Sequence, residues 1–438
     1  MKTRQRAILR IALPAIITNI TTPILGLVDI AIAGRLGSAA YLGAIAVGSS
    51  LFNMIYWLLN FLRAGTSGLT AQAVGAGEDS SRDTIFYRGL FIGGIAGVVV
   101  LALAPLLAYI FIPFMEADAS TSTLAEEYFL IVITGAPAYI ASYAISGWLL
   151  GNQDSVSTLK IAVLTNVINI ALSLTFVLAL KLKIEGVALG TAISQWIGFA
   201  YGLYIVRSKY APRLKGWKTI TDSGSLKRFF KLNLDIFLRT LCLVAVTLWF
   251  TRTGAGLGAE ILAANALLMQ LFLLFSFFMD GFAYAGEALA GKFLGAGTRE
   301  KIRILEKDLL KWGVALSCVG MIVYFVAGDH ILGLLTKEEG VKAVASDYLP
   351  WAVTIPLCGF MAFIYDGIFI GISLTRKMLL SMLTAIAVFF GVFFLLYPRL
   401  GNHALWLAFS LYLISRGIAQ AILLGAFHKK SGLPEESA

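Results

Sequence analysis

Residues 9–33 read LRIALPAIITNITTPILGLVDIAIA, an apolar run that contains a single carboxylate, Asp29. A membrane core about 30 Å thick is crossed by about 20 apolar residues in one helix, so this stretch is long enough to span it. The basic residues before the run and the lack of a small-residue cleavage site after it predict a retained first span, not a cleaved signal peptide.

The rest of the chain has the same character. Of its 438 residues, 58% are hydrophobic and 14% are charged, whereas soluble domains are about half apolar and a quarter charged. Backbone polar groups in hydrocarbon must bond within their own segment, so we predict an all-α integral membrane fold with twelve transmembrane helices. The predicted spans are residues 8–33, 43–72, 86–113, 126–150, 157–180, 184–206, 229–251, 259–291, 309–327, 344–372, 377–397 and 402–427.

Lysine and arginine are distributed unevenly among the loops between these spans. With the N-terminus inside the cell, roughly 25 basic residues fall in inside loops and roughly 7 in outside loops. Cytoplasmic loops carry such an excess, so we expect a multi-pass protein of the cell inner (plasma) membrane with both termini cytoplasmic. The formal charge of +10 then reflects topology, and no basic stripe with interleaved aromatic residues indicates a nucleic-acid partner.

The sequence also matches itself at an offset of about 220 residues. GLTAQAVGAG at 68–77 corresponds to ALAGKFLGAG at 288–297, and GWLLG at 147–151 corresponds to GIFIG at 367–371. An ordered series at one offset indicates duplication, with six spans in each half and the same orientation of both halves in the membrane. The predicted domains are an N-lobe at 1–206, a cytoplasmic basic linker at 207–228 and a C-lobe at 229–438.

Asp29 is one of four polar residues that we expect at similar depth in the outer half of the membrane. The others are Asn169 and Ser173, which share one helix face, and Thr191 on the following span. A charge at mid-bilayer costs at least about 2.5 kcal/mol, so such a residue needs an explanation. These oxygens could hold a small cation, or the carboxyl group could carry a proton; the structural alternative is a hydrogen-bonded Asp29 that only locks helices together.

The second half carries a polar cluster of its own, which counting along the spans places in the inner half of the membrane. Its members are Asp235, Arg239, Asp280, Glu287, Asp366 and Arg416. Four carboxylates and two guanidinium groups cannot face lipid, so we expect them to point inward and to pair in part. Asp235 and Arg239, four apart on one helix, are the expected structural pair. Asp280 and Asp366 are the expected contacts for a proton or a substrate.

Proline interrupts the first span at Pro14 and Pro23. Since proline removes a helix hydrogen bond and clashes with the preceding turn, this helix can bend near Asp29, either as a protonation-dependent switch or as a static kink. The sequence contains no Ser/His/Asp set, no HExxH and no Walker A motif, so we expect a secondary active transporter, not an enzyme. We also expect no metal site, no cofactor and a monomer.

Stretches along nearly the whole chain resemble the multidrug and toxic compound extrusion (MATE) family, and within it the DinF-like branch. They are LRIALPAIITNITTPILGLVDIAIAGRLG, FLRAGTSGLTAQAVGAG, NLDIFLRT, MDGFAYAGEALAG, YDGIFIG and LGNHALWLAF. The resemblance implies twelve helices in two pseudo-symmetric six-helix lobes around a central cleft, set in the lipid bilayer. It also implies alternating-access export of small organic cations or amphipathic compounds in exchange for protons or sodium ions.

The resemblance assigns roles to single residues. Pro14 and Asp29 look like the helix-1 bend and its essential carboxylate. Asn169 and Thr191 look like the polar partners of that carboxylate, and Asp366 looks like the acidic residue of the second lobe.

One position departs from the family. Its pattern N-x-x-x-D on the fifth span reads NIALS here, with Ser173 where an Asp is usual. A sodium site would lose a charged ligand at that position, so we favour H+ as the coupling ion, acting through Asp29, with Na+ as the alternative.

A lipid-linked precursor flippase of the same superfamily is the alternative function. A flippase should carry a larger and more cationic central cavity and often extra spans, whereas the intramembrane charges of this sequence are acidic in excess and twelve spans suffice. An integral membrane enzyme is a third interpretation, which the missing catalytic set disfavours.

Overall fold

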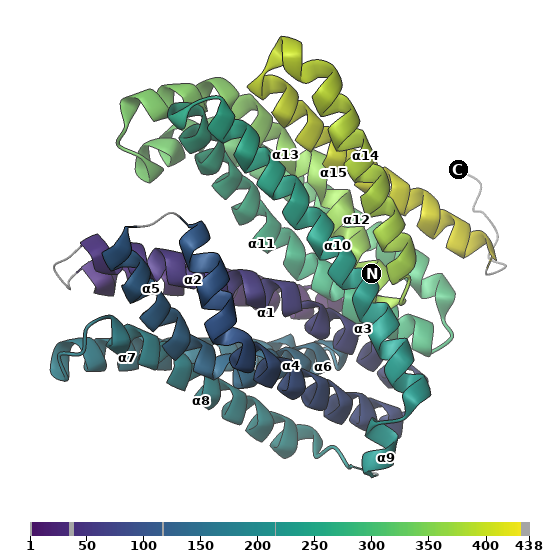
Figure 1. Cartoon of the computed structure of the whole chain (residues 1–438). Coiled ribbons are helices and arrows are strands. Elements are labelled where there is room, and N and C mark those ends of the chain that lie inside the picture. The colour runs from purple at the N-terminus through teal and green to yellow at the C-terminus, as the bar shows by residue number, and fades with distance from the viewer. Residues whose placement is uncertain (1, 35–38, 116–117, 215, 431–438) are drawn as a thin grey trace. The chain divides into compact units, whose positions relative to one another are not determined.

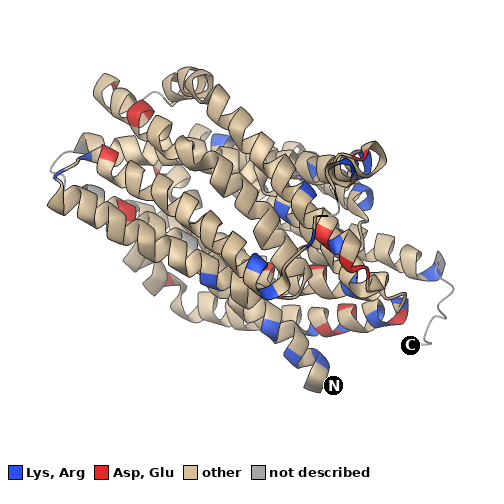
Figure 2. Cartoon of the chain, turned by 90° about the horizontal axis from the view of Figure 1, so that it is seen from below, with Lys and Arg blue, Asp and Glu red and all other residues tan. Residues whose placement is uncertain are grey.

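The computed structural model describes residues 2–34, 39–115, 118–214 and 216–430. Within these ranges the regular structure is helical, and twelve segments are long and apolar enough to cross a membrane. The predicted all-α fold with twelve spans is therefore confirmed, and in Figure 2 most of the ribbon is tan, the colour of residues other than Lys, Arg, Asp and Glu. The helices run past most of the predicted ends, because hydropathy marks only the part of a helix that lies in hydrocarbon. Arg35 and Lys215, which belong to the loops used to predict orientation, lie outside the described residues.

The chain divides into two compact units. One unit, here called the amino-terminal unit, is formed by Leu13–Asn233. The other, here called the carboxyl-terminal unit, is formed by Leu234–Ala438 together with Met1–Ala12. Helices α1 (Lys2–Gly34) and α10 (Ser223–Gly256) therefore each contribute residues to both units.

The amino-terminal unit contains most of α1 and the following helices. They are α2 (Ala39–Leu59), α3 (Phe61–Ala76), α4 (Asp79–Phe114), α5 (Ala119–Val132), α6 (Ala136–Gly151), α7 (Ser155–Leu174), α8 (Ile184–Tyr210) and the short α9 (Trp217–Ile220). A turn at Asn60 separates α2 from α3 within one apolar span, and a 3₁₀ turn, Ile133–Gly135, joins α5 to α6. A π-helical turn, Thr175–Ala179, extends α7.

The carboxyl-terminal unit contains most of α10 and five further helices. They are α11 (Ala259–Gly295), α12 (Arg299–Leu335), α13 (Glu339–Gly371), α14 (Thr375–Leu400) and α15 (Asn402–Lys430). Helices α11 and α13 pack side by side along most of their length, as do α14 and α15 (Figure 1). Phe369, Phe389 and Trp406 are among the fully buried side chains of this core.

Equivalent helix pairs in the two units pack in the same register. A Cβ atom at Gly147 of α6 would collide with the carbonyl oxygen of Arg63 in α3, and one at Gly367 of α13 would collide with that of Ala283 in α11. The same relation recurs one helical turn later for Gly151 with Ser67 and for Gly371 with Glu287. All four pairs agree with the predicted offset of about 220 residues, and glycine is required because two backbones touch there.

The first residues of α1 are held by the carboxyl-terminal unit. Arg4 Nε lies 3.1 Å from Asp308 Oδ2, and Trp312 Nε1 donates a hydrogen bond of 2.5 Å to Gln5 Oε1. Because the boundary between the units falls between Ala12 and Leu13, the helix passes from one unit to the other just before Pro14.

Candidate functional site

Helices α7 and α8 place two of the predicted polar residues in direct contact. Asn169 Nδ2 donates a hydrogen bond of 3.0 Å to Thr191 Oγ1, and Thr191 Oγ1 donates its own proton to the carbonyl of Val187 at 3.1 Å. Asn169 and Thr191 are both buried. These two residues are therefore in contact, as expected. Because Thr191 Oγ1 already donates its hydrogen to Val187, it can only accept further hydrogen bonds.

Tyr128 of α5 connects this pair to Asp29 of α1. Its hydroxyl lies near the side chain of Thr191, and it lies close enough to Asp29 to interact with that charge. Residues next to the site, including Val28 and Ile32 of α1, share one apolar cluster with Tyr128. Four helices of the amino-terminal unit thus bring the site together.

The site contains buried oxygen atoms that have no hydrogen-bond partner among the described residues. Asp29 is 8% exposed, and within the described part of the chain its Oδ1 has no hydrogen-bond partner. The same holds, again among the described residues, for Asn169 Oδ1 and Ser173 Oγ. Nor does any described Lys, Arg or His form an ion pair with Asp29. A buried carboxylate without a cationic partner is stable only when it takes up a proton or a cation.

Ser173 lies in a tightly packed place. Its side chain is fully buried, and a Cβ at Gly190 of α8 would collide with its Oγ. The π-helical turn that begins at Thr175 follows directly, and such turns occur often at functional sites. The serine that replaces the usual family Asp is therefore inside the site but has little room around it.

The first helix is continuous in this structure through both prolines. Thr18 Oγ1 donates a hydrogen bond of 2.9 Å to the carbonyl of Pro14, and Thr21 Oγ1 donates one of 2.7 Å to the carbonyl of Thr18. Side-chain bonds of this kind compete with the helix ladder and favour bending. The bend at Pro14 stays a prediction.

In the carboxyl-terminal unit, Asp366 of α13 is surrounded by donors. Arg239 of α10 and Arg416 of α15 both form ion pairs with its Oδ2, and Gln420 Nε2 donates a hydrogen bond of 2.7 Å to its Oδ1. Asp280 of α11 interacts electrostatically with both arginines. Two carboxylates thus balance two guanidinium groups, which removes most of the cost of burying them.

The structure corrects one predicted pairing. Arg239 of α10 pairs with Asp366 of α13, not with Asp235 one turn earlier on its own helix, so a tertiary contact takes the place of the expected i,i+4 pair. Asp235 instead accepts a hydrogen bond of 2.9 Å from Thr375 Oγ1. Glu287 is buried on α11. Asp366, which we expected to meet a proton or a substrate, is engaged on both oxygens.

Sequence reasoning missed a row of aromatic side chains in the amino-terminal unit. Tyr56 stacks on Tyr139 with ring centroids 4.2 Å apart, and Tyr143 meets Tyr139 edge-on at 5.3 Å. Phe52 continues the row, 5.7 Å from Tyr56 and 6.3 Å from Tyr128. The row ends beside Asp29, so flat apolar surface adjoins the carboxylate. An aromatic residue inside an apolar run gives no periodic signal, so Tyr128 was not predicted as a site residue.

The chain resembles known proteins over most of its length. The family model described as MatE matches residues 14–175 and 235–395. The chain is 35% identical to DNA damage-inducible protein F of Escherichia coli (strain K12), covering 95% of this chain and 91% of that protein. It is 22% identical to multidrug resistance protein MdtK of Yersinia enterocolitica, with 97% and 96% covered. In structure it is similar to a MOP superfamily transporter from Pyrococcus furiosus, with a TM-score of 0.87 at 19% identity and with 98% and 97% covered.

Proposed function

The chain belongs to the MatE family, the multidrug and toxic compound extrusion transporters, in the branch of DNA damage-inducible protein F, and on that premise we propose that it is a proton-coupled antiporter. It exports small organic cations or amphipathic compounds by alternating access. Protons enter as drug leaves, and Asp29 is the group that binds them. The protein lies in the cell inner membrane with both termini in the cytoplasm.

One observation carries this proposal: Asp29 is buried in a membrane span, and no described residue pairs with its charge. Leaving it ionised would cost several kcal/mol, so the resting carboxyl group holds a proton. A cationic substrate or a rearrangement that admits water would favour the carboxylate and release that proton. Binding of a cation and binding of a proton then exclude each other, which is the requirement for exchange.

Proton coupling is favoured over sodium coupling by the ligands present. A sodium site needs several oxygens and is strengthened by a second carboxylate. Asp29, Asn169, Ser173 and Thr191 supply one carboxylate between them, and Ser173 stands where a second would be. Thr191 Oγ1 is also already hydrogen-bonded to Asn169 and to the carbonyl of Val187.

The flippase alternative requires cationic side chains that are free to bind a lipid diphosphate. Two arginines of the carboxyl-terminal unit, the partly buried Arg239 and the buried Arg416, both pair with Asp366. Their charge is neutralised within the unit, so this cluster does not favour an anionic cargo.

The proposal is tested with purified protein in liposomes loaded with a cationic dye. An inward proton gradient should drive dye out of the vesicles, and an inward sodium gradient at equal pH on both sides should not. Dye export driven by sodium alone would reject proton coupling. If neither gradient moves dye and the protein instead flips a lipid-linked precursor across the bilayer, the flippase function would be supported.

A further inference from the structure

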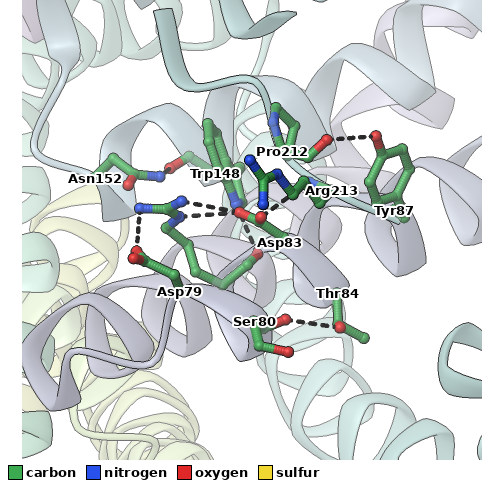
Figure 3. A network of polar contacts seen from close by, with 10 residues as sticks. Asp79, Ser80, Asp83, Thr84, Tyr87, Trp148, Asn152, Pro212 and Arg213 are labelled. Atoms are coloured by element: carbon green, nitrogen blue, oxygen red, sulfur yellow. Dashed lines mark hydrogen bonds and ion pairs between the residues drawn. The ribbon is translucent and has the colours of Figure 1, made fainter. Parts of the chain in front are cut away.

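The segment between α8 and α10 is fixed to α4 by four hydrogen bonds to its backbone. The buried Arg88 donates through Nε to the carbonyl of Ile220 at 3.1 Å and through Nη2 to that of Thr219 at 2.8 Å. Tyr87 donates to the carbonyl of Pro212 at 3.0 Å, and Asp83 accepts from the amide of Arg213 at 2.9 Å (Figure 3). The backbone of the described residues of this segment is therefore held in a defined position on α4.

Asp83 is itself held in place by a second layer of contacts. Arg82 bridges Asp83 and Asp79, with N–O distances of 3.0 and 2.7 Å, and Trp148 Nε1 donates to the carbonyl of Arg82 at 2.9 Å (Figure 3). The segment is thus anchored through α4 to the buried core of α6.

Two large apolar side chains of this segment are nevertheless exposed. Leu214 is 51% exposed and Trp217 is 60% exposed, although the Trp217 ring touches Phe91 edge-on with centroids 5.1 Å apart. Tryptophan is enriched where membrane proteins meet the headgroup region, because its ring is apolar and its N–H is polar. A fixed and exposed Trp–Leu pair at the end of two membrane spans fits that position.

The same surface is strongly basic. Six exposed basic residues carry no ion pair among the described residues. They are Arg207, Arg213, Lys218, Lys227, Arg228 and Lys231. Lys209, in contrast, is paired with Asp154 at 2.6 Å. Asp222 is the exposed acidic residue within this stretch. The charge is therefore not compensated within the described part of the segment, and it calls for an anionic partner.

A neighbouring cavity does not supply the anion site. Its volume is about 580 Å³, and its lining includes Glu78, Asp79 and Asp222 beside Arg88. Three carboxylates repel a phosphate group, and Arg88 is already committed to backbone carbonyls. The anion-binding surface is the exposed basic side chains, not the cavity.

We propose that this surface, formed by Leu214, Trp217 and the six basic residues, binds the headgroups of anionic phospholipids in the membrane around the protein. The basic side chains contact the lipid phosphates, and the two apolar side chains lie at the boundary of the acyl chains. Anionic lipid attracts basic residues next to a span, and the ends of α8 and α10 bring these residues to that depth. The inference does not depend on the coupling ion, so it can fail without affecting the proposed function.

The test uses brominated lipids, which quench nearby tryptophan fluorescence. Full-length protein is reconstituted in phosphatidylcholine vesicles that contain an equal fraction of brominated phosphatidylglycerol or brominated phosphatidylcholine. The signal of Trp217 is the difference between the wild type and Trp217→Phe. We expect quenching of Trp217 at least about threefold stronger with the anionic lipid, because each nearby basic residue adds to lipid attraction. Equal quenching by the two lipids would overturn the proposal.

A charge variant and a matched control locate the effect. Replacing Lys218, Lys227, Arg228 and Lys231 by Gln should remove the preference for phosphatidylglycerol. Replacing Lys181, Lys183, Lys337 and Lys342 by Gln changes the net charge equally and should leave it intact. Loss in both variants, or in neither, contradicts the assignment.

Salt gives an independent check that needs no variant. The preference of the wild type should fall steeply as ionic strength rises, because surface charges are screened. A preference that persists unchanged at high salt would overturn the proposed contact with phosphates.

Discussion

Asn169 donates its amide hydrogen to Thr191 Oγ1 across 3.0 Å, between α7 and α8. This bond fixes the orientation of the Asn169 amide and leaves its carbonyl oxygen buried and, among the described residues, unpaired. Tyr128 lies near both Thr191 and Asp29. Asp29 is therefore buried without a cationic partner among the described residues, which favours a proton on its carboxyl group.

Replacing Asp29 by Asn should abolish coupled export. The amide resembles a protonated carboxyl group but cannot release a proton, so dye efflux from proteoliposomes under a proton gradient should fall to that of empty liposomes. The variant should still fold, because no ion pair among the described residues is lost. The exposed Asp347→Asn is the matched control and should transport normally. Near-normal efflux by Asp29→Asn would remove this residue from the mechanism.

Replacing Ser173 by Asp should introduce a response to sodium. The change places a second carboxylate beside Asn169 and restores the ligand that a sodium site prefers. Transport by this variant should respond to a sodium gradient, whereas Ser173→Asn, which has the same size without the charge, should not. Because Gly190 packs against Ser173, both variants should lose a similar amount of stability. No sodium response in a folded Ser173→Asp protein would contradict the role given to this position.

Replacing Asp366 by Asn should destabilise the protein. Arg239 and Arg416 would lose their shared partner, and breaking a buried ion pair costs about 3–5 kcal/mol. The unfolding temperature in detergent should fall well below that of the wild type, whereas Asp29→Asn should leave it unchanged or raise it. Equal unfolding temperatures for Asp366→Asn and Asp29→Asn would contradict the finding that Asp366 has ion-pair partners and Asp29 has none among the described residues.

Replacing Gly147 by Ala should sharply lower the yield of folded protein. The added Cβ would meet the carbonyl oxygen of Arg63 on the facing helix, and neither backbone can move without repacking its unit. Gly367→Ala should behave alike, because it is the equivalent position in the repeat. Gly94→Ala, where nothing lies within 4 Å of the added atom, is the control. Wild-type yield for the first two variants would argue against the shared register.

Asp154, between α6 and α7, should make stability depend on pH. Burial alone would raise the pKa of its carboxyl group, but hydrogen bonds from Lys209, Ser157 and Tyr210 outweigh burial and lower the pKa below 3.8. A lowered pKa stabilises the fold above the unfolded value, and this stabilisation is lost as the pH falls through the folded value. At pH 7, the free energy of unfolding of the wild type should exceed that of Asp154→Asn by about 1 kcal/mol. Thermal unfolding should show that gap closing at low pH; a gap independent of pH would refute the assignment.

The twelve spans could be predicted because apolar length alone decides whether a helix crosses hydrocarbon. The repeat was visible because Gly147 and Gly367 are fixed by backbone contact and tolerate no side chain. Asn169 and Thr191 could be placed together because both positions follow from counting along adjacent helices. Each of these predictions needed only distance along the chain.

The partners of charged groups could not be predicted in the same way. Asp366 meets Arg416 and Gln420 on α15 because of how three helices rotate about their axes, and the sequence does not specify that rotation. The i,i+4 spacing predicted an ion pair between Arg239 and Asp235, but Arg239 pairs with Asp366 on another helix. Tyr128 is uncharged and follows no sequence pattern, so only its position near Thr191 and Asp29 in the structure identified it.

The central claim is that Asp29 binds and releases the coupled proton. The most direct test adds a cationic dye to purified protein in weakly buffered detergent solution and measures the protons released. The wild type should release protons in proportion to the dye bound, and Asp29→Asn should release none. Equal release from both proteins, or no release from a wild type that binds dye, would contradict the claim.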